Sequence, residues 1–200
     1  MTQLPSSSQL RKELAREIVR SDNRKKALLI GSVVLGFLFV CVLFHASFLY
    51  KVTDSDMSPT LKEKDLLIRK KAKKLKAGDL VIVEYEGETT IRRVVAVGND
   101  WVDFDRNGNL YVNNQYMEEA YLSEKTMGLC DLDLPYQVPE GQFFLLADER
   151  NETVDSRQQV FGCLTLKEIK GKVTFRIWPW KDFGSLKARQ KQPADDDTES

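Results

Sequence analysis

An uninterrupted apolar stretch near the N-terminus constrains this chain more than any other feature. Residues 27–50 read ALLIGSVVLGFLFVCVLFHASFLY, without Lys, Arg, Asp or Glu. As an α-helix this stretch would extend about 36 Å, enough to cross a hydrocarbon core of about 30 Å with some tilt. A cleavable signal peptide has an apolar core of only about 7–15 residues and a small-residue cleavage site. This stretch is longer and ends in bulky Phe48, Leu49 and Tyr50. We therefore expect an uncleaved transmembrane helix over residues 27–50.

The flanking charges predict how this helix is oriented. Asp22 is the nearest acidic residue before the stretch, and the basic residues before it are Arg11, Lys12, Arg16, Arg20, Arg24, Lys25 and Lys26. Basic flanks favour the cytoplasmic side, and large domains cross a membrane largely regardless of their charge. Basic residues also follow the stretch, so the charge bias is moderate. We expect a single-pass protein of the cell membrane with a cytoplasmic N-terminus and an extracellular C-terminal domain.

The remaining chain divides into three parts. Residues 1–26 are polar and form the expected cytoplasmic segment, in which apolar residues between positions 10 and 19 recur at near-helical spacing. Residues 51–187 contain short runs rich in β-branched and aromatic residues, such as DLVIVEYEG and GKVTFRIW, separated by Gly, Asn and Asp. This pattern predicts a mainly β, antiparallel domain of sandwich or barrel type. Residues 188–200 are polar and are expected to be disordered.

Composition narrows the classes of function. The 30 Lys and Arg residues balance 30 Asp and Glu residues, so the net charge does not point to nucleic acid. We expect no nucleic-acid partner, no metal and no cofactor. Cys41 lies in the apolar stretch, whereas Cys130 and Cys163 would lie in an oxidising compartment where disulfides persist. The sequence gives no distance between these two cysteines, so their pairing stays open.

A basic run, RKKAKKLK, occupies residues 69–76. Clustered lysines attract anions, so the run could bind anionic lipid, a cell-wall polymer or an acidic partner. Lysines are also common on solvated loops and strand edges, where they discourage edge pairing. From the sequence alone we favour the second interpretation.

Four segments behind the apolar stretch form an ordered pattern. Residues 56–61 read DMSPTL, residues 78–83 read GDLVIV and residues 91–100 read IRRVVAVGND. Residues 138–150 read VPEGQFFLLADER, and DSR follows at residues 155–157. In this order they resemble the motifs of the type I signal peptidases (peptidase S26). Members of that family are membrane-anchored serine proteases with a Ser/Lys dyad, and the resemblance implies a signal peptidase-like antiparallel β domain behind a single N-terminal transmembrane helix.

The resemblance places unusual residues at the dyad positions. DMSPTL aligns with the family's Ser-Met-x-Pro-Thr-Leu and puts Asp56 at the nucleophile. The arginine that follows the family's lysine aligns with Arg93 and puts Arg92 at the general base. An aspartate lacks the hydroxyl that forms an ordinary ester acyl-enzyme. An arginine, with a pKa above about 12, cannot take up the proton. We therefore expect Asp56 and Arg92 to form an ion pair where the dyad stood.

A third position departs in the same direction. Two residues before the nucleophile the family carries a small hydroxyl residue that helps to bind the oxyanion, and here that position is Asp54. A carboxylate would repel a developing negative charge. Ser55 is the alternative nucleophile, although in an extended segment it would face away from Asp56. The only histidine, His45, lies inside the apolar stretch.

Other positions match the family and predict that the surroundings of the site are retained. These site-supporting residues are Met57, Pro59, Thr60, Arg93, Asp148, Arg150, Thr153, Asp155, Ser156 and Arg157.

The sequence therefore predicts a catalytically inactive signal peptidase-like protein that binds an extended exported polypeptide by strand addition. By family analogy such proteins are chaperone-like accessory factors in Gram-positive pilus assembly, with a pilin-type subunit and a sortase as candidate partners. One alternative is an active type I signal peptidase that removes signal peptides with a displaced nucleophile such as Ser55. Another is a structural membrane protein that docks a partner through its surface.

Overall fold

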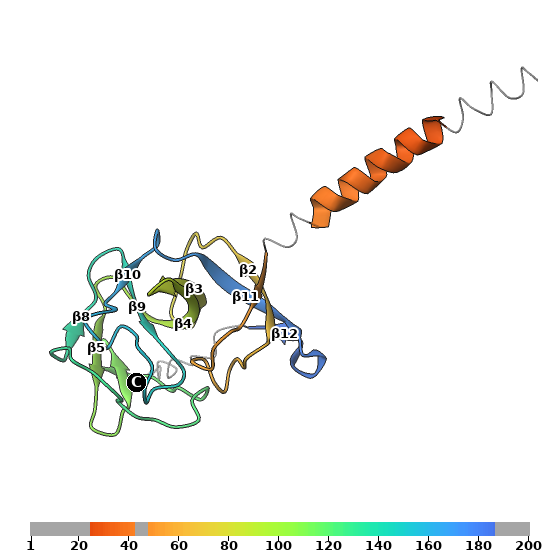
Figure 1. Cartoon of the computed structure of the whole chain (residues 1–200). Coiled ribbons are helices and arrows are strands. Elements are labelled where there is room, and N and C mark those ends of the chain that lie inside the picture. Colours follow the sequence, from red (N-terminus) through yellow and green to blue (C-terminus); the bar gives the residue numbers. More distant parts are fainter. Residues whose placement is uncertain (1–24, 43–47, 187–200) are drawn as a thin grey trace, which may run out of the picture. The chain divides into compact units, whose positions relative to one another are not determined.

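The computed structural model describes residues 25–42 and 48–186, which belong to two separate units (Figure 1). In the first unit, residues Lys25–Val42 form an α-helix that is long and apolar enough to cross a membrane, the only such helix in the described ranges. A helix suits this role because it satisfies every backbone hydrogen bond internally. The sequence predictions for residues 1–24, His45 and the C-terminal tail lie outside the described residues.

The expected helix over residues 27–50 extends too far at its C-terminal end. Leu49 and Tyr50 belong instead to the first strand of the second unit, β1 (Leu49–Lys51). Leu49 pairs with Ile68 of the following strand. Apolar character alone does not distinguish the end of a helix from a short strand. Here the pairing of Leu49 with Ile68 shows that the residues form a strand.

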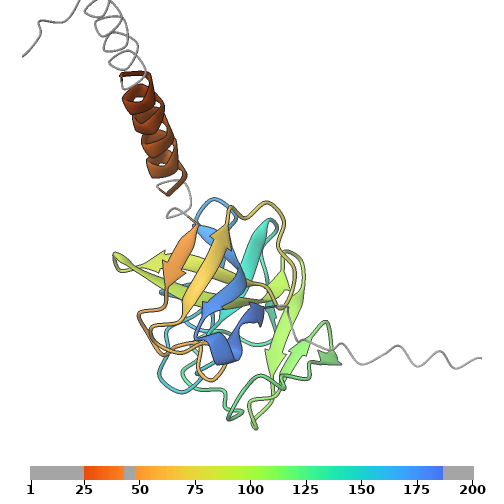
Figure 2. The ribbon, with the colours of Figure 1, turned by 90° about the vertical axis from the view of Figure 1, so that its right-hand side faces the viewer.

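The second unit, which begins at Phe48, is built from two antiparallel sheets. The larger has the strand order β1-β2-β11-β3-β4-β9-β10 with β12 beside β11, and the smaller has the order β7-β6-β5-β8. The remaining elements are β2 (Leu66–Lys70), β3 (Leu80–Tyr85), β4 (Glu88–Val97), β5 (Trp101–Phe104), β6 (Leu110–Val112), β7 (Gln115–Tyr116), β8 (Tyr136–Gln137), β9 (Gln142–Leu146), β10 (Leu164–Thr165), β11 (Gly171–Trp178), the 3-10 helix η1 (Trp180–Asp182) and β12 (Gly184–Ser185). Figure 2 shows β1, β2 and β11 side by side. The predicted fold class, mainly antiparallel β behind one N-terminal helix, is confirmed.

The core of this unit fixes the segments that matter for the site. β4 is buried from Thr90 through Ala96 because side chains pack on both of its faces. Met57 and Leu61, from the loop between β1 and β2, pack with Ile82 and Ile91 in one cluster of fully buried side chains. Each such side chain contributes about 1.5–3 kcal/mol through burial. The motif loop is therefore held against β4 by apolar contacts. Cys130 and Cys163 are both free thiols.

Candidate functional site

The loop that carries the first motif folds as a turn rather than as the extended segment we expected. The Ser58 amide donates to the Ser55 carbonyl at 2.9 Å, and the Leu61 amide donates to the Met57 carbonyl at 2.8 Å. Met57 and Leu61 are four residues apart and both are fully buried, so one turn brings both side chains to the same side. The turn leaves Asp56 half-buried and directs it toward β4.

Asp56 and Arg92 form the predicted ion pair, with Arg92 Nη2 lying 2.9 Å from Asp56 Oδ2. The Arg92 side chain is 3% exposed and that of Asp56 is 30% exposed. Arg92 Nη1 donates to Thr90 Oγ1 at 2.6 Å and to the Ile91 carbonyl at 2.7 Å. Nε and Nη2 donate to the Val154 carbonyl at 3.1 and 2.9 Å. All five N–H groups of the guanidinium thus have acceptors, which stabilises a buried charge that would otherwise be costly.

Asp54 joins this network through Thr90, a residue that sequence reasoning missed. The Thr90 hydroxyl lies 2.9 Å from Asp54 Oδ2 and 3.4 Å from Asp56 Oδ2. The Asp56 amide donates to Asp54 Oδ1 at 3.3 Å. Burial raises the pKa of Asp54 and repulsion from Asp56 raises it further, against the hydrogen bond from Thr90 and the charge of Arg92. The position expected to face an oxyanion therefore carries a carboxylate that is itself crowded by negative charge.

The two serines beside Asp56 lie in different surroundings. Ser55 is exposed and Ser58 is half-buried. Within residues 48–186 neither hydroxyl forms a hydrogen bond with a lysine or arginine side chain. A serine nucleophile needs an adjacent base to be activated, and the described residues do not supply one at either position.

Arg93 and Asp148, two of the predicted supporting residues, form a buried bidentate pair. Arg93 Nε donates to Asp148 Oδ1 at 2.8 Å, and Arg93 Nη2 contacts Oδ2. The Thr60 hydroxyl donates to the same Oδ2 oxygen. The Arg93 guanidinium also lies 3.9 Å from the centroid of the Tyr121 ring, a cation–π distance. This pair ties the motif loop to both β4 and the segment after β9.

Arg150 is held by partners that no motif indicated. It forms a fully buried ion pair with Glu119, whose carboxylate also accepts the Tyr121 hydroxyl at 2.6 Å. Arg150 Nε donates to the Ala147 carbonyl at 2.7 Å. Burial, together with Glu119, raises the pKa of Tyr121. Glu119 and Tyr121 lie in an irregular segment between the strands β7 and β8, where only a long-range contact could have identified them.

The DSR segment forms the base of the site. Arg157 donates to both oxygens of Asp155, at 2.8 and 2.9 Å, and all their side-chain atoms are buried. Asp155 also accepts the Ala147 amide at 3.0 Å, and Ser156 Oγ accepts an amide of β9 at 2.9 Å. Thr153 is buried and presents its carbonyl to Arg157. These bonds fix the segment that supplies the Val154 carbonyl to Arg92.

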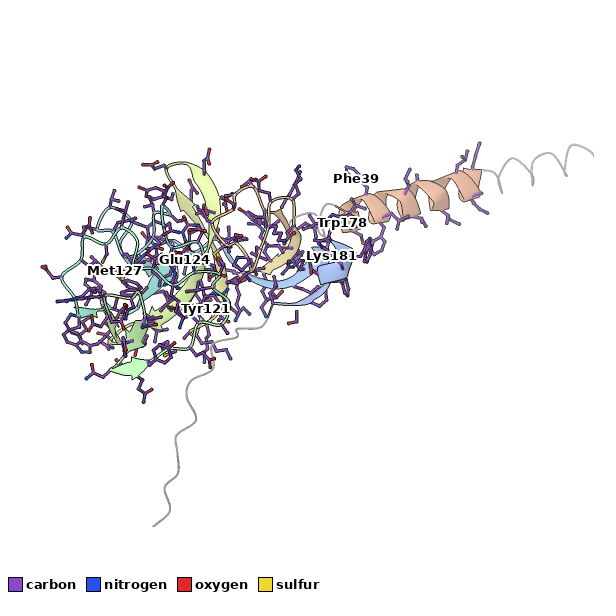
Figure 3. The ribbon with its side chains drawn as sticks, turned by 90° about the horizontal axis from the view of Figure 1, so that it is seen from below. Phe39, Tyr121, Glu124, Met127, Trp178 and Lys181 are labelled. Carbon is purple, nitrogen blue, oxygen red and sulfur yellow. The ribbon has the colours of Figure 1, made fainter. Side chains whose placement is uncertain are left out.

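A close approach of the backbone completes this base. Gly128 has a φ of +58°, and a Cβ added there would lie 1.9 Å from the Arg150 carbonyl oxygen. The neighbouring Met127 carbonyl accepts an N–H of Arg157. In Figure 3, Met127 lies toward the end of the β unit opposite that of Trp178 and Lys181. The segment before β8 therefore depends on glycine at this point.

The first half of β4 presents an unpaired edge beside the ion pair. Residues 88–92 pair with β3 on one side, whereas pairing with β9 begins only at Arg93. In the described part of the chain no strand pairs with the other edge of residues 88–92. Two carbonyls of this segment accept side-chain donors: Thr89 from the Tyr50 hydroxyl at 2.8 Å, and Ile91 from Arg92. An open strand edge of this kind can pair with an extended peptide.

A cavity of about 560 Å³ lies beside this network rather than over the ion pair. Its lining includes Pro59, Thr60, Arg93, Tyr121 and Arg176, together with residues 182–186. Asp54, Asp56 and Arg92 do not line it. Within the described residues, no group of three or more His, Cys, Asp or Glu side chains is placed to hold a metal ion.

Comparison with known proteins identifies the relatives of this chain. Residues 24–178 match the family described as "Signal peptidase, peptidase S26". Signal peptidase IB of Staphylococcus aureus is 30% identical over 182 residues, which cover 80% of this chain and 94% of that protein. Signal peptidase I of Bacillus licheniformis is 29% identical over 183 residues, covering 82% and 96%. The crystal structure of a signal peptidase I from Enterococcus faecalis V583 is 23% identical, with a TM-score of 0.43, and the match covers 50% of this chain and 96% of that one.

Proposed function

The chain belongs to the peptidase S26 signal peptidase family, and from this premise we propose that it is a catalytically inactive member that binds exported polypeptides. The observation that carries the proposal is the ion pair between Asp56 and Arg92 at the positions aligned with the dyad. A general base must be unprotonated for part of its cycle. An arginine side chain cannot serve as that base, and Arg92 directs its five N–H groups to the Asp56 carboxylate and to three neighbouring oxygens.

The unpaired edge of β4 supports binding by strand addition. An extended polypeptide could pair with residues 88–92, where the carbonyls of Thr89 and Ile91 now accept side-chain donors. Incoming backbone N–H groups would replace those donors, so the net gain for each exchanged hydrogen bond is small. Affinity would then depend on pockets for alternate side chains, which suits a protein that holds a segment and releases it.

Membrane attachment follows from the N-terminal helix. Its large apolar side chains, from Leu28 to Val42, are 51–75% exposed, which in water would be an unfavourable apolar surface. We infer a single-pass anchor in the cell membrane, with a cytoplasmic N-terminus because basic residues precede the helix. The β unit that begins at Phe48 would then lie outside the cell.

The proposed partners are exported surface proteins. By family analogy the specific role is a chaperone-like step in Gram-positive pilus assembly, with a pilin-type subunit as the bound polypeptide and a sortase acting beside it. An extended segment of such a subunit would fit the open edge of β4 during assembly. This assignment rests on the analogy together with the replaced dyad.

The second candidate function is an active signal peptidase with Ser55 as nucleophile. It is favoured by the names of the relatives, which are called signal peptidases, and by the exposure of Ser55 next to Asp56. It requires a base that reaches Ser55 after rearrangement of the turn. The two functions differ in a single measurable product, a cleaved preprotein.

Cleavage is tested with the purified full-length chain and an exported preprotein. We expect the wild type to leave the preprotein intact, with Asp56→Ser/Arg92→Lys as the variant that restores both dyad residue types. If the wild type cleaves, and Ser55→Ala abolishes cleavage while Ser58→Ala does not, the active peptidase is correct and the inactive binder is rejected.

Binding is tested in cells by placing a photo-crosslinking residue at Thr89, on the open edge. The matched control places it at Asn107, an exposed position in the turn between β5 and β6. We expect an exported polypeptide to be captured from Thr89 and not from Asn107. Equal capture at the two positions would exclude the edge of β4 as the binding surface.

A further inference from the structure

The loop between β2 and β3 presents a row of lysines from a folded backbone. The last residue of β2 and the loop that follows it carry five exposed lysines: Lys70, Lys71, Lys73, Lys74 and Lys76. Between them Ala72 is buried, and Leu75 packs against the same apolar cluster. The Lys76 amide donates to Asp79 Oδ2 at 3.0 Å. We call these five residues the lysine surface. Apolar contacts therefore anchor the loop from inside, while its lysine side chains are exposed to solvent.

The positive charge of the lysine surface is not neutralised by the protein. Asp79 is the only acidic residue between positions 66 and 79, and it is paired with Lys172 at 2.6 Å. Nearby Lys170 is paired with Glu84 at 2.8 Å. Within the described residues, none of the five surface lysines forms an ion pair. Unpaired like charges on one loop repel one another, so an anionic ligand would relieve that repulsion.

The lysine surface lies at the end of the β unit where the unit begins, at Phe48. β1 and β2 are antiparallel, with Leu49 opposite Ile68. The Arg69 amide donates to the carbonyl of Phe48, the first residue of the unit, at 2.7 Å. Lys70 is the next residue after Arg69, so the lysine surface starts beside Phe48. In Figures 1 and 2 this loop leaves β2 at the end where β1 starts. Only residues 43–47 separate Phe48 from the apolar helix.

We propose that the lysine surface binds the anionic headgroups of membrane lipids next to the point where the chain enters the bilayer. The inference rests on the membrane anchor of the proposed function. Each lysine near an anionic membrane adds favourable electrostatic energy, and the anchor supplies a high effective concentration, so weak individual contacts suffice. The contact orients the β unit on the membrane, which would direct its open β4 edge consistently. Screening by salt should weaken it, because the lysines are solvent-exposed.

The test compares the full-length chain in two kinds of nanodisc, one of phosphatidylcholine alone and one that also contains phosphatidylglycerol. Surface lysines are acetylated with an amine-reactive reagent and quantified by mass spectrometry. We expect the lysine surface to react about fivefold more slowly in the anionic discs, a factor equivalent to about 1 kcal/mol. Lys64 and Lys181, both exposed and outside the loop, are the internal controls and should react equally in both discs. High salt should remove the difference.

A charge variant provides the second arm. Lys71→Gln/Lys73→Gln/Lys74→Gln should lose the rise in thermal unfolding temperature that anionic discs give the wild type. The control variant Lys62→Gln/Lys64→Gln/Lys181→Gln removes the same amount of charge outside the lysine surface. It should keep the rise in thermal unfolding temperature. Protection by soluble polyphosphate without protection by anionic discs would assign the surface to a phosphate polymer and overturn the lipid proposal. Equal reactivity in both discs overturns it as well. If the chain fails to enter either disc, the anchor itself is wrong, whereas entry without protection removes only the lysine inference.

Discussion

Arg92 shows at the scale of one residue why the site holds an ion pair so firmly. Besides the Asp56 carboxylate, its guanidinium donates to three acceptors: the Thr90 hydroxyl and the Ile91 carbonyl of β4, and the Val154 carbonyl. A lysine has three N–H donors on one nitrogen and cannot reach acceptors spread around a plane. The residue type is therefore suited to bracing the loop against β4, and unsuited to accepting a proton.

Arg92→Lys alone is accordingly expected to destabilise the β unit. Two or more acceptors lose their donors, and buried acceptors without partners cost about 1–3 kcal/mol. The measurement is the free energy of unfolding in denaturant. Arg106→Lys makes the same exchange at an exposed position and should change the stability by less than about 0.5 kcal/mol. Equal effects from the two variants would show that the Arg92 hydrogen bonds add nothing.

Asp54 predicts a pH dependence of stability. Burial first, and then Asp56, raise the pKa of Asp54 above its ordinary value of 3.8. The folded state therefore binds this proton more readily than the unfolded state, so the stability that Asp54 contributes is present below the ordinary value and is lost as the pH rises through the folded-state pKa. Asp54→Asn removes this titrating group. As the pH rises across that window, the unfolding free energy of the variant should therefore increase relative to that of the wild type. A pH series of denaturant melts measures it.

The control for this pH series is Asp133→Asn, which removes an exposed carboxylate. Its difference from wild type should stay flat over the same range. If Asp54→Asn also gives a flat difference, crowding of negative charge around Asp54 is not a source of instability, and the network through Thr90 must be reconsidered.

Single residues of the site differed in how far the sequence could predict them. The pairing of Asp56 with Arg92 followed from their places in two motifs and from opposite charge. Thr90 carries no such signal, because a threonine in a strand is ordinary. Glu119 could not be predicted either, because its partner Arg150 is 31 residues away in the sequence and no local pattern links the two. Sequence motifs therefore predict the site residues that lie within the motifs themselves. The other residues of the site are revealed only by contacts in the folded structure.

At the scale of elements, the segment before β8 depends on the absence of one side chain. Gly128→Ala is expected to destabilise the β unit by about 3 kcal/mol or more, because a Cβ would lie 1.9 Å from the Arg150 carbonyl and would also meet Arg157. Gly87→Ala is the matched control: φ is +84°, close to that of many turn glycines, and nothing lies within 4 Å. It should cost about 1 kcal/mol, the backbone term alone. Thermal and denaturant unfolding would separate the two. Similar losses would mean that the close approach relaxes at little cost.

The strands themselves were more predictable than their neighbours in the sheet. Runs rich in β-branched and aromatic residues identified strands such as β3 and β11, because strand preference is a local property. The order of the larger sheet was not accessible: β11 inserts between β2 and β3, across about a hundred residues of sequence. β1 was missed because its residues continue an apolar stretch. Which strands pair with one another depends on contacts between residues far apart in the sequence. Local sequence patterns carry no information about those contacts.

For the whole molecule, the two units differ in the solvent that their side chains require. The helix exposes apolar side chains throughout its length, whereas the β unit buries its own clusters and carries charge outside. A chain of this kind is expected at a membrane–water boundary. The proposed orientation then fixes the compartment in which the open β4 edge and the lysine surface operate, so topology is the property on which both proposals depend.

Cysteine labelling tests that topology in intact cells. Single-cysteine variants that retain Cys130 or Cys163 are treated with a membrane-impermeant maleimide. Burial raises the pKa of Cys163 to about 11, against a hydrogen bond with Tyr136. A rise of about two pKa units lowers the thiolate fraction about a hundredfold, but a more basic thiolate is also more nucleophilic. Cys163 should therefore react about tenfold more slowly than the same thiol in denatured protein. Cys130 should be labelled without cell lysis if the β unit is extracellular. Labelling of Cys130 only after lysis would reverse the orientation, and with it place the binding edge in the cytoplasm, where no exported polypeptide would reach it after translocation.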